Sequence, residues 1–288
     1  MASVSVVVTD LDGTLWHLDD HIHPAVLDAW AELERRGIPV LVATGRRVTS
    51  TRVPLARFGL RPDAVVLNGA LGLDLDTGER FHRAPYTGDE AVAVLDAFGD
   101  AGLAPVVYVD HPEVDAFLAP EPSTNPDHVT GLGGTARTDD LGRVVREETV
   151  LGFSMIGVPF HDAEAAADRV GDRAEVHLDR SIDYEGTASL TVAPRGQSKW
   201  DGVAAYCAAR GLDPTRVLAL ADGANDLELL DGAAVGLVPE VAHPAALARA
   251  SHVIPAAAAG GWAAVLDHLD SPGRTGRVRP AISRRRGG

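Results

Sequence analysis

Two aspartates, Asp10 and Asp12, follow an apolar run of small β-branched residues in the stretch VSVVVTDLDGTLW, residues 4–16. Positions i and i+2 of an extended segment point to the same side, so we expect the two carboxylates to face one space. Two unit charges about 4 Å apart repel by about 4 kcal/mol at an effective dielectric constant of 20. A metal ion, a proton on one carboxylate, or both must offset this repulsion. Mg²⁺ suits such oxygen ligands and would also gather a phosphate.

Two further polar groups stand where helices are expected to begin. Thr44, Gly45 and Arg46 in VLVATGRR combine a hydroxyl with the free backbone N–H groups of a helix start, which together form an anion site. Lys199 in APRGQSKWDGV is the only lysine among 26 basic residues. Its compact charge suits phosphate oxygens, or aspartates that are brought close together.

Acidic residues recur in VLALADGANDLELL. An apolar run delivers Asp222, a glycine turn follows, and Asn225 and Asp226 begin a helix. Two more acids at a strand end would deepen the repulsion unless they complete the shell of a divalent cation.

These polar groups require strands that end beside them. Short apolar runs alternate with alanine-rich stretches of helical periodicity, which is typical of an α/β fold with a mostly parallel sheet. Strands are expected at about 4–10, 38–43, 64–67, 216–221 and 234–238. Helices are expected at about 24–36, 47–57, 198–210, 225–231 and 243–250. Ligands of open α/β sheets bind outside the carboxyl ends of the strands, where these polar groups would meet.

The middle of the chain has a different pattern. Four strands, APVVYV, VLGFSMIGV, AEVHL and ASLTVAP, and helices near 88–100 and 162–170 predict an inserted α+β unit. The expected division is a core of residues 1–80 and 191–270, an insert of residues 81–190, and a basic, disordered tail of residues 271–288. The GLGGT stretch is expected to be a loop, because it does not open a helix after a strand.

Composition narrows the class of protein. The chain has 288 residues and a net charge of −15, which argues against nucleic-acid or membrane-surface binding. A single cysteine, Cys207, excludes an intrachain disulfide and fits a reducing compartment. No apolar run approaches the roughly 20 residues of a membrane span, and no signal pattern opens the chain, so a cytoplasmic location is expected.

Taken in order, DLDGT, ATGR, the isolated Lys199 and DGAND resemble the four motifs of the haloacid dehalogenase superfamily. The insertion after VVLNGA is similar to that of the sugar-phosphatase-like branch, the Cof-type hydrolases with a type IIB α/β cap. The resemblance implies a Rossmann-like core, a parallel sheet flanked by helices, with an α+β cap that determines substrate specificity. It covers about 170 residues of the core, and the cap only in outline. The chain departs from the family pattern at Ala221, where a glycine is usual.

The resemblance implies roles for the acidic residues. Asp10 would attack phosphorus and form an aspartyl-phosphate. Asp12 would protonate the leaving alcohol and then deprotonate the attacking water. Mg²⁺ would be held by the Asp10 carboxylate, the Asp12 backbone carbonyl and the Asp222 carboxylate, with Asp226 supporting that shell.

The resemblance also implies which residues bind the substrate. Phosphate-binding residues would be Thr44, Gly45, Lys199 and Asn225. Further substrate contacts would come from Arg46, Asn68 and Gly69.

The expected function is a Mg²⁺-dependent phosphatase acting on a small phosphorylated metabolite, with a sugar phosphate as the expected substrate. A phosphomutase is the second enzymatic reading, because it can use the same aspartate pair and Mg²⁺. A dehalogenase is disfavoured, since that chemistry needs neither Asp12 nor a metal. A non-catalytic binding protein on the same fold is the remaining alternative, although every residue of the expected machinery is present.

Overall fold

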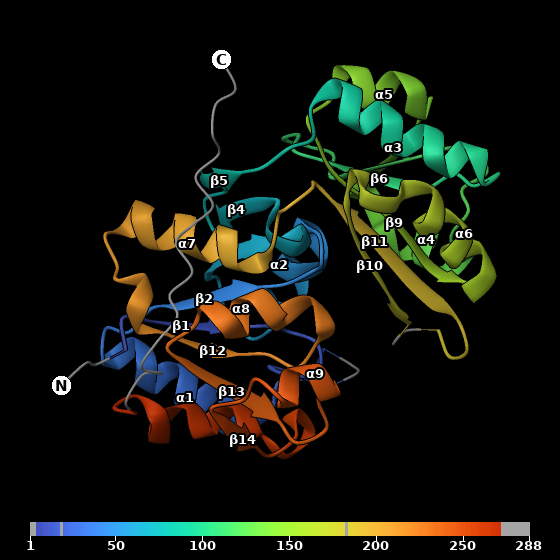
Figure 1. The fold of residues 1–288 in the computed structure, drawn as a ribbon. Helices are drawn as coiled ribbons and strands as arrows, with labels where there is room; N and C mark the ends of the chain where they lie inside the picture. Colours follow the sequence, from blue (N-terminus) through green and yellow to red (C-terminus); the bar gives the residue numbers. More distant parts are fainter. Residues whose placement is uncertain (1–3, 18–19, 182–183, 272–288) are drawn as a thin grey trace.

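A computed structural model describes residues 4–17, 20–181 and 184–271, and it contains two β-sheets (Figure 1). The larger sheet, here called the core sheet, has the order β14-β13-β12-β1-β2-β3-β4-β5. Neighbouring strands from β14 to β3 are parallel, whereas β4 and β5 each pair antiparallel with the strand before them. Its strands are β1 (Val6–Thr9), β2 (Val40–Ala43), β3 (Asp63–Val66), β4 (Leu71–Asp74), β5 (Arg80–Arg83), β12 (Val217–Leu220), β13 (Val235–Pro239) and β14 (His252–Ile254).

Helices cover both faces of the core sheet. One face packs against α1 (Pro24–Arg35), α2 (Val48–Arg57) and the 3-10 segment η7 (Gly261–His268). The other face packs against α7 (Lys199–Arg210), α8 (Leu227–Gly232) and α9 (Pro244–Leu247). Val7 belongs to the first apolar cluster and its neighbours Val6 and Val8 to the second, so β1 is buried on both sides. This two-sided burial explains why the central strands read as continuous apolar runs.

The smaller sheet lies between β5 and α7 in the chain and has the order β10-β11-β9-β6-β7-β8. Together with four helices it forms a second body, here called the inserted unit (Figure 1). Its strands are β6 (Val106–Val109), β7 (Ala116–Leu118), β8 (Ala136–Thr138), β9 (Val150–Val158), β10 (Glu175–Arg180) and β11 (Ala188–Ala193). Its helices are α3 (Gly88–Asp100), α4 (Pro126–Leu132), α5 (Leu141–Glu147) and α6 (Phe160–Val170).

The two faces of the smaller sheet have different neighbours. Residues of α3, α5 and α6 pack in one apolar cluster with Phe153 and Leu190, so these helices cover the outer face. Val106 and Tyr108 belong instead to the cluster that includes Leu71 of the core sheet. We call this second side the inner face, and it is the side turned toward the core.

The α/β class predicted from the sequence is confirmed, and the inserted unit contains more elements than expected. The short strands β7 and β8 and the helices α4 and α5 add to the four strands and two helices predicted. The GLGGT stretch, residues 131–135, was expected to be a loop, and this expectation is wrong. It forms the last residues of α4 and a 3-10 turn, because α4 begins earlier, after the N-cap Asn125. Residues 272–288, almost all of the predicted tail, lie outside the described residues.

Within the described part of the chain, no helix is long and apolar enough to cross a bilayer.

Candidate active site

Asp10 stands directly after β1, at the carboxyl end of a central strand. Its backbone N–H donates to the carbonyl of Leu220 at 2.9 Å, which ties it to the end of the neighbouring strand β12. Its side chain is almost fully buried. The position between β2 and β12 is the point where strand order reverses, and open α/β sheets bind ligands at such points.

Lys199 joins Asp10 to Asp226. Its Nζ donates to Asp10 Oδ1 at 2.9 Å and to Asp226 Oδ1 at 2.7 Å. The lysine is 1% exposed and Asp226 is fully buried, so this ion pair is shielded from water. Ser198 fixes the start of α7 through a reciprocal cap with Asp201, and this places Lys199 at the first position of the helix.

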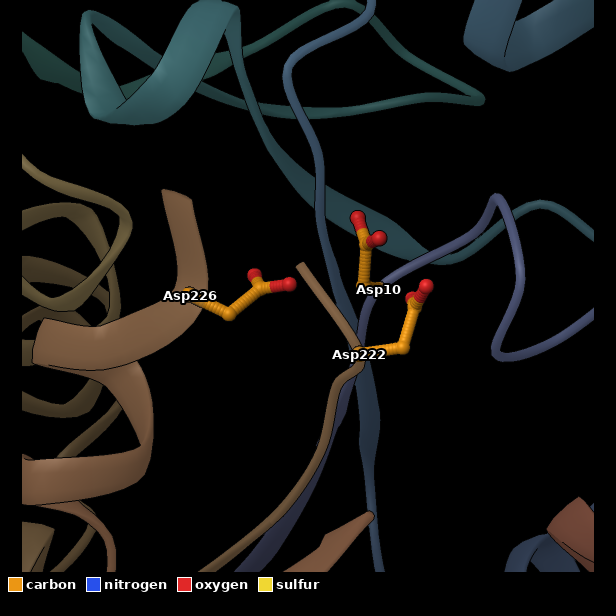
Figure 2. Close-up of side chains that lie close together, drawn as sticks. All are labelled: Asp10, Asp222 and Asp226. Carbon is orange, nitrogen blue, oxygen red and sulfur yellow. The ribbon is translucent and has the colours of Figure 1, made fainter. Parts of the chain in front are cut away.

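Asp222 follows β12 and brings a third carboxylate to the same place. Oxygen atoms of Asp10, Asp222 and Asp226 all lie within 4.8 Å of one another, and Figure 2 shows Asp226 reaching from the 3-10 turn η5 (Ala224–Asp226) toward the other two. Thr14 Oγ1 donates to Asp222 Oδ1 at 2.6 Å. Gly13 has φ +76°, and a Cβ there would overlap the Asp222 carboxylate, so only glycine permits this close approach.

The electrostatics of this cluster are those of a cation site. Burial raises the pKa of Asp10 well above its usual value, and the charge of Lys199 opposes that rise. Burial, and next the charge of Asp226, raise the pKa of Asp222 to about 6. Three carboxylates face one ammonium group, which leaves two uncompensated negative charges when all are ionised. The all-oxygen donor set and this charge fit a divalent hard cation such as Mg²⁺.

Asp12 has different partners from the other three aspartates. Arg46 donates from Nε to Asp12 Oδ2 at 2.7 Å and from NH2 to Oδ1 at 2.5 Å, and Trp16 Nε1 donates to Oδ1 at 2.9 Å. Arg46 also pairs with Asp20 at 2.8 Å. The Asp12 carboxylate thus has partners of its own outside the cluster of three carboxylates, although its charge still contributes to raising the pKa of Asp10 and of Asp222. Because β1 ends at Thr9, the alternation of an extended strand does not set the orientation of this side chain.

A second polar group adjoins the carboxylate cluster. Asn225 Nδ2 donates to Asn68 Oδ1 at 2.9 Å, and Asn68 Nδ2 donates to Thr191 Oγ1 of the inserted unit at 3.3 Å. The backbone N–H of Asn68 donates to the Thr44 carbonyl at 3.1 Å. A Cβ on Gly45 would lie 3.0 Å from Asn68 Oδ1, so this glycine also lies against the asparagine. Asn68 adopts the left-handed conformation, with φ 52° and ψ 32°, which asparagine tolerates better than most residues.

Gly69, the next residue, packs against the start of α7. A Cβ there would overlap the carbonyl oxygen of Ser198, and Gln197 Nε2 donates to the Gly69 carbonyl at 3.1 Å. The structure thus places Gly69 against the start of α7, where it allows Lys199 to approach Asp10.

Several residues at the site were not singled out from the sequence. Thr14 bonds Asp222, and Trp16 and Asp20 complete the contacts of Asp12 and Arg46. The signal for Thr14 is its place in the DLDGT motif, where a hydroxyl follows the turn glycine. The sequence indicates the role of Trp16 less clearly. Trp16 is four residues from Asp12, and the two side chains can meet only because the chain turns after β1.

Most of the chain is similar in sequence to known proteins. A family model described as haloacid dehalogenase-like hydrolase matches residues 7–266. A phosphoglycolate phosphatase of Methanopyrus kandleri is 26% identical over 236 residues, covering 82% of this chain and 84% of that protein. A pyridoxal phosphate phosphatase of Escherichia coli is 23% identical over 263 residues, covering 86% of this chain and 92% of that protein.

Solved structures share the fold. A phosphatase of the haloalkanoate dehalogenase superfamily from Bacteroides thetaiotaomicron superposes with a TM-score of 0.75 at 18% identity, covering 93% of this chain and 96% of that chain. A sugar phosphatase of subclass IIB of the same superfamily gives a TM-score of 0.73 at 18% identity, covering 92% and 98%. Both core and inserted unit therefore have counterparts in these structures.

Proposed function

The chain belongs to the haloacid dehalogenase-like hydrolases, and we propose that within this family it hydrolyses a small sugar phosphate, using Mg²⁺ and an aspartyl-phosphate on Asp10. It is a phosphatase, and the named relatives act on small phosphorylated metabolites. The proposal adds three details to the phosphatase activity, namely a sugar phosphate as the substrate, Mg²⁺ as the metal ion and a covalent intermediate. The observation that carries it is the buried contact between Asp10 and Lys199 beside two further aspartates.

Asp10 supplies the nucleophile. One of its carboxylate oxygens attacks phosphorus, the bond from phosphorus to the leaving-group oxygen breaks, and an acyl-phosphate forms. Water then attacks the same phosphorus, which releases inorganic phosphate and restores the carboxylate. Lys199, 2.9 Å from Asp10 Oδ1, orients that carboxylate and offsets its charge as the anionic substrate approaches.

Asp12 moves the protons. It gives a proton to the departing alkoxide and takes one from the attacking water in the second step. Arg46 and Trp16 hold its carboxylate in one orientation, separate from the cluster formed by the other three aspartates. This separation supports different tasks for Asp10 and Asp12.

Asp10, Asp222 and Asp226 are the side chains that would hold Mg²⁺, together with the backbone carbonyl of Asp12. When bound, the ion offsets the two uncompensated charges of the cluster and attracts phosphate oxygens. Thr14 keeps Asp222 in place for this role through its 2.6 Å hydrogen bond.

The remaining site residues bind and select the substrate. Phosphate oxygens are bound by Thr44, Gly45, Lys199 and Asn225, and Asn68 contacts the substrate from beside them. Residues 81–190 act as the cap that contacts the leaving group. Thr191 lies one residue beyond this range, in β11 of the inserted unit, and its hydrogen bond from Asn68 supports the role because it brings the inner face of that unit to the site.

The test is phosphate release from a panel of phosphorylated metabolites, with Mg²⁺ and with EDTA. Metal-dependent release from one or a few sugar phosphates is expected, and Asp10→Asn should abolish it. Asp100→Asn, at the exposed end of α3, is the matched control and should retain full activity. Phosphate that stays on an isomeric product would instead indicate a phosphomutase, and no turnover of any ester would refute the phosphatase.

A further inference from the structure

The inner face of the smaller sheet can be defined from strand register. His177 of β10 and Ser154 of β9 are both directly opposite Thr191 of β11, and directly opposed residues share a face of a sheet. Thr191 accepts a hydrogen bond from Asn68 of the core. His177, Thr191 and Ser154 therefore form one row that faces the core.

His177 lies within electrostatic range of Lys199 in the catalytic cluster. Burial lowers the pKa of His177, and the charge of Lys199 lowers it further, while Glu175, Glu228 and Asp179 act in the other direction. Lys199 and Glu228 belong to the core, so the imidazole is within electrostatic range of both. Its Nε2 is buried and makes no hydrogen bond to any described residue. A neutral imidazole with one nitrogen that makes no hydrogen bond can donate to, or accept from, a hydroxyl group.

Positive charge is concentrated on the other side of this sheet. The six strands contain two arginines, Arg137 and Arg180. Arg137 is opposite Phe117, which belongs to the outer apolar cluster. Arg180 stacks on Phe160 of α6, 5.5 Å from the ring centre, and so also lies on the outer face. Among the described strand residues, none offers a lysine or arginine on the inner face.

Acidic groups occupy the inner face instead. Glu175 and Asp179 alternate with His177 along β10 and share its side of the sheet. The core guanidinium that reaches the inserted unit, that of Arg47, is paired with Asp115, and that of Arg46 is paired with Asp12 and Asp20. A leaving group that carries a carboxylate would meet hydroxyls, a neutral imidazole and like charges, which oppose its binding.

We propose that His177 and Thr191 bind hydroxyl groups of the substrate's leaving group, so that the enzyme prefers esters of neutral polyols to phosphate esters of carboxylic acids. This inference rests on the proposed phosphatase function and names its substrate class. Both residues are specificity determinants that touch the leaving group, away from the reacting phosphorus.

The experiment measures kcat and KM of the holoenzyme for hexose phosphates, glycerol phosphate, phosphoglycolate and p-nitrophenyl phosphate. His177→Ala should raise KM for the best polyol phosphate about tenfold, the effect of one lost hydrogen bond. Its kcat/KM for p-nitrophenyl phosphate, which has no hydroxyl to lose, should stay within about twofold. His177→Gln, which keeps a polar group at this place, should recover most of the affinity. His161→Ala, on the exposed surface of α6, is the matched histidine control.

Two results would overturn the proposal. One is an unchanged KM of His177→Ala for every polyol phosphate. The other is wild-type kcat/KM for phosphoglycolate equal to that for the best polyol phosphate. Either result would leave the phosphatase intact, because p-nitrophenyl phosphate is still hydrolysed. Absence of turnover with p-nitrophenyl phosphate as well would refute the phosphatase and this inference together.

Discussion

Replacing Lys199 by methionine keeps the length of the side chain and removes the ammonium that contacts Asp10 and Asp226. Each contact, at 2.9 and 2.7 Å, corresponds to a gross attraction of about 6 kcal/mol at an effective dielectric constant of 20. Desolvation of the three groups offsets much of this. Removing one partner of a buried ion pair generally destabilises a protein by about 3–5 kcal/mol, because the other charge stays buried without a partner. We therefore expect Lys199→Met to lower the free energy of unfolding by about 3–5 kcal/mol at pH 7.5 in EDTA.

Urea denaturation followed by circular dichroism measures this change. If the m-value is the same for both proteins, the shift of the denaturation midpoint gives the difference in unfolding free energy. Arg210→Met is the matched control, because Arg210 pairs with Asp63 at the surface and is 43% exposed. Its loss should be below about 1 kcal/mol. At pH 5 the effect of Lys199→Met should shrink, since protonation then relieves the unpaired carboxylates. A loss below about 1 kcal/mol at pH 7.5, equal to that of the control, would show that Lys199 does not stabilise the buried carboxylates.

Three further predictions concern the aspartates and their neighbours. Arg46→Lys loses the two-pronged contact with Asp12, so kcat should fall about tenfold with little change in melting temperature, and an unchanged kcat would argue against positioning by Arg46. Gly13→Ala should weaken Mg²⁺ binding at least tenfold by calorimetry, because its Cβ displaces Asp222, whereas Gly37→Ala, with similar φ but open space around it, should not. The raised pKa of Asp222, about 6 against 3.8, stabilises the metal-free fold below pH 4, and this stabilisation is lost as pH rises through 6. Relative to Asp222→Asn in EDTA, the wild type should thus lose about 2 kcal/mol of unfolding free energy between pH 4 and 7, and parallel pH profiles would contradict the assignment.

The meeting of Asp10, Lys199 and Asp222 is predictable because each follows a short buried strand or opens the next helix. Parallel strands bring such ends to one edge of the sheet, whatever their separation in the chain. The orientation of Asp12 is not predictable in this way. It depends on a turn after β1 and on Arg46, a residue 34 positions away whose side chain could equally have faced the substrate.

The elements of the inserted unit can also be predicted only in part from the sequence. The nine residues of β9 read as one apolar run, whereas β7 and β8 have three residues each and carry little periodicity. Alternation along β10 puts His177 and Arg180 on opposite faces of the sheet, but only the register and the covering helices show which face is turned toward the core. Local pattern predicts an element more readily than it predicts the element's neighbours.

The most direct measurement is rapid quenching of the enzyme with its best sugar phosphate and Mg²⁺, followed by mass spectrometry of proteolytic peptides. A transient phosphoryl group is expected on Asp10, absent from Asp10→Asn and formed at a rate no slower than turnover. A phosphoryl group on another residue, or turnover by Asp10→Asn at the wild-type rate, would contradict this expectation.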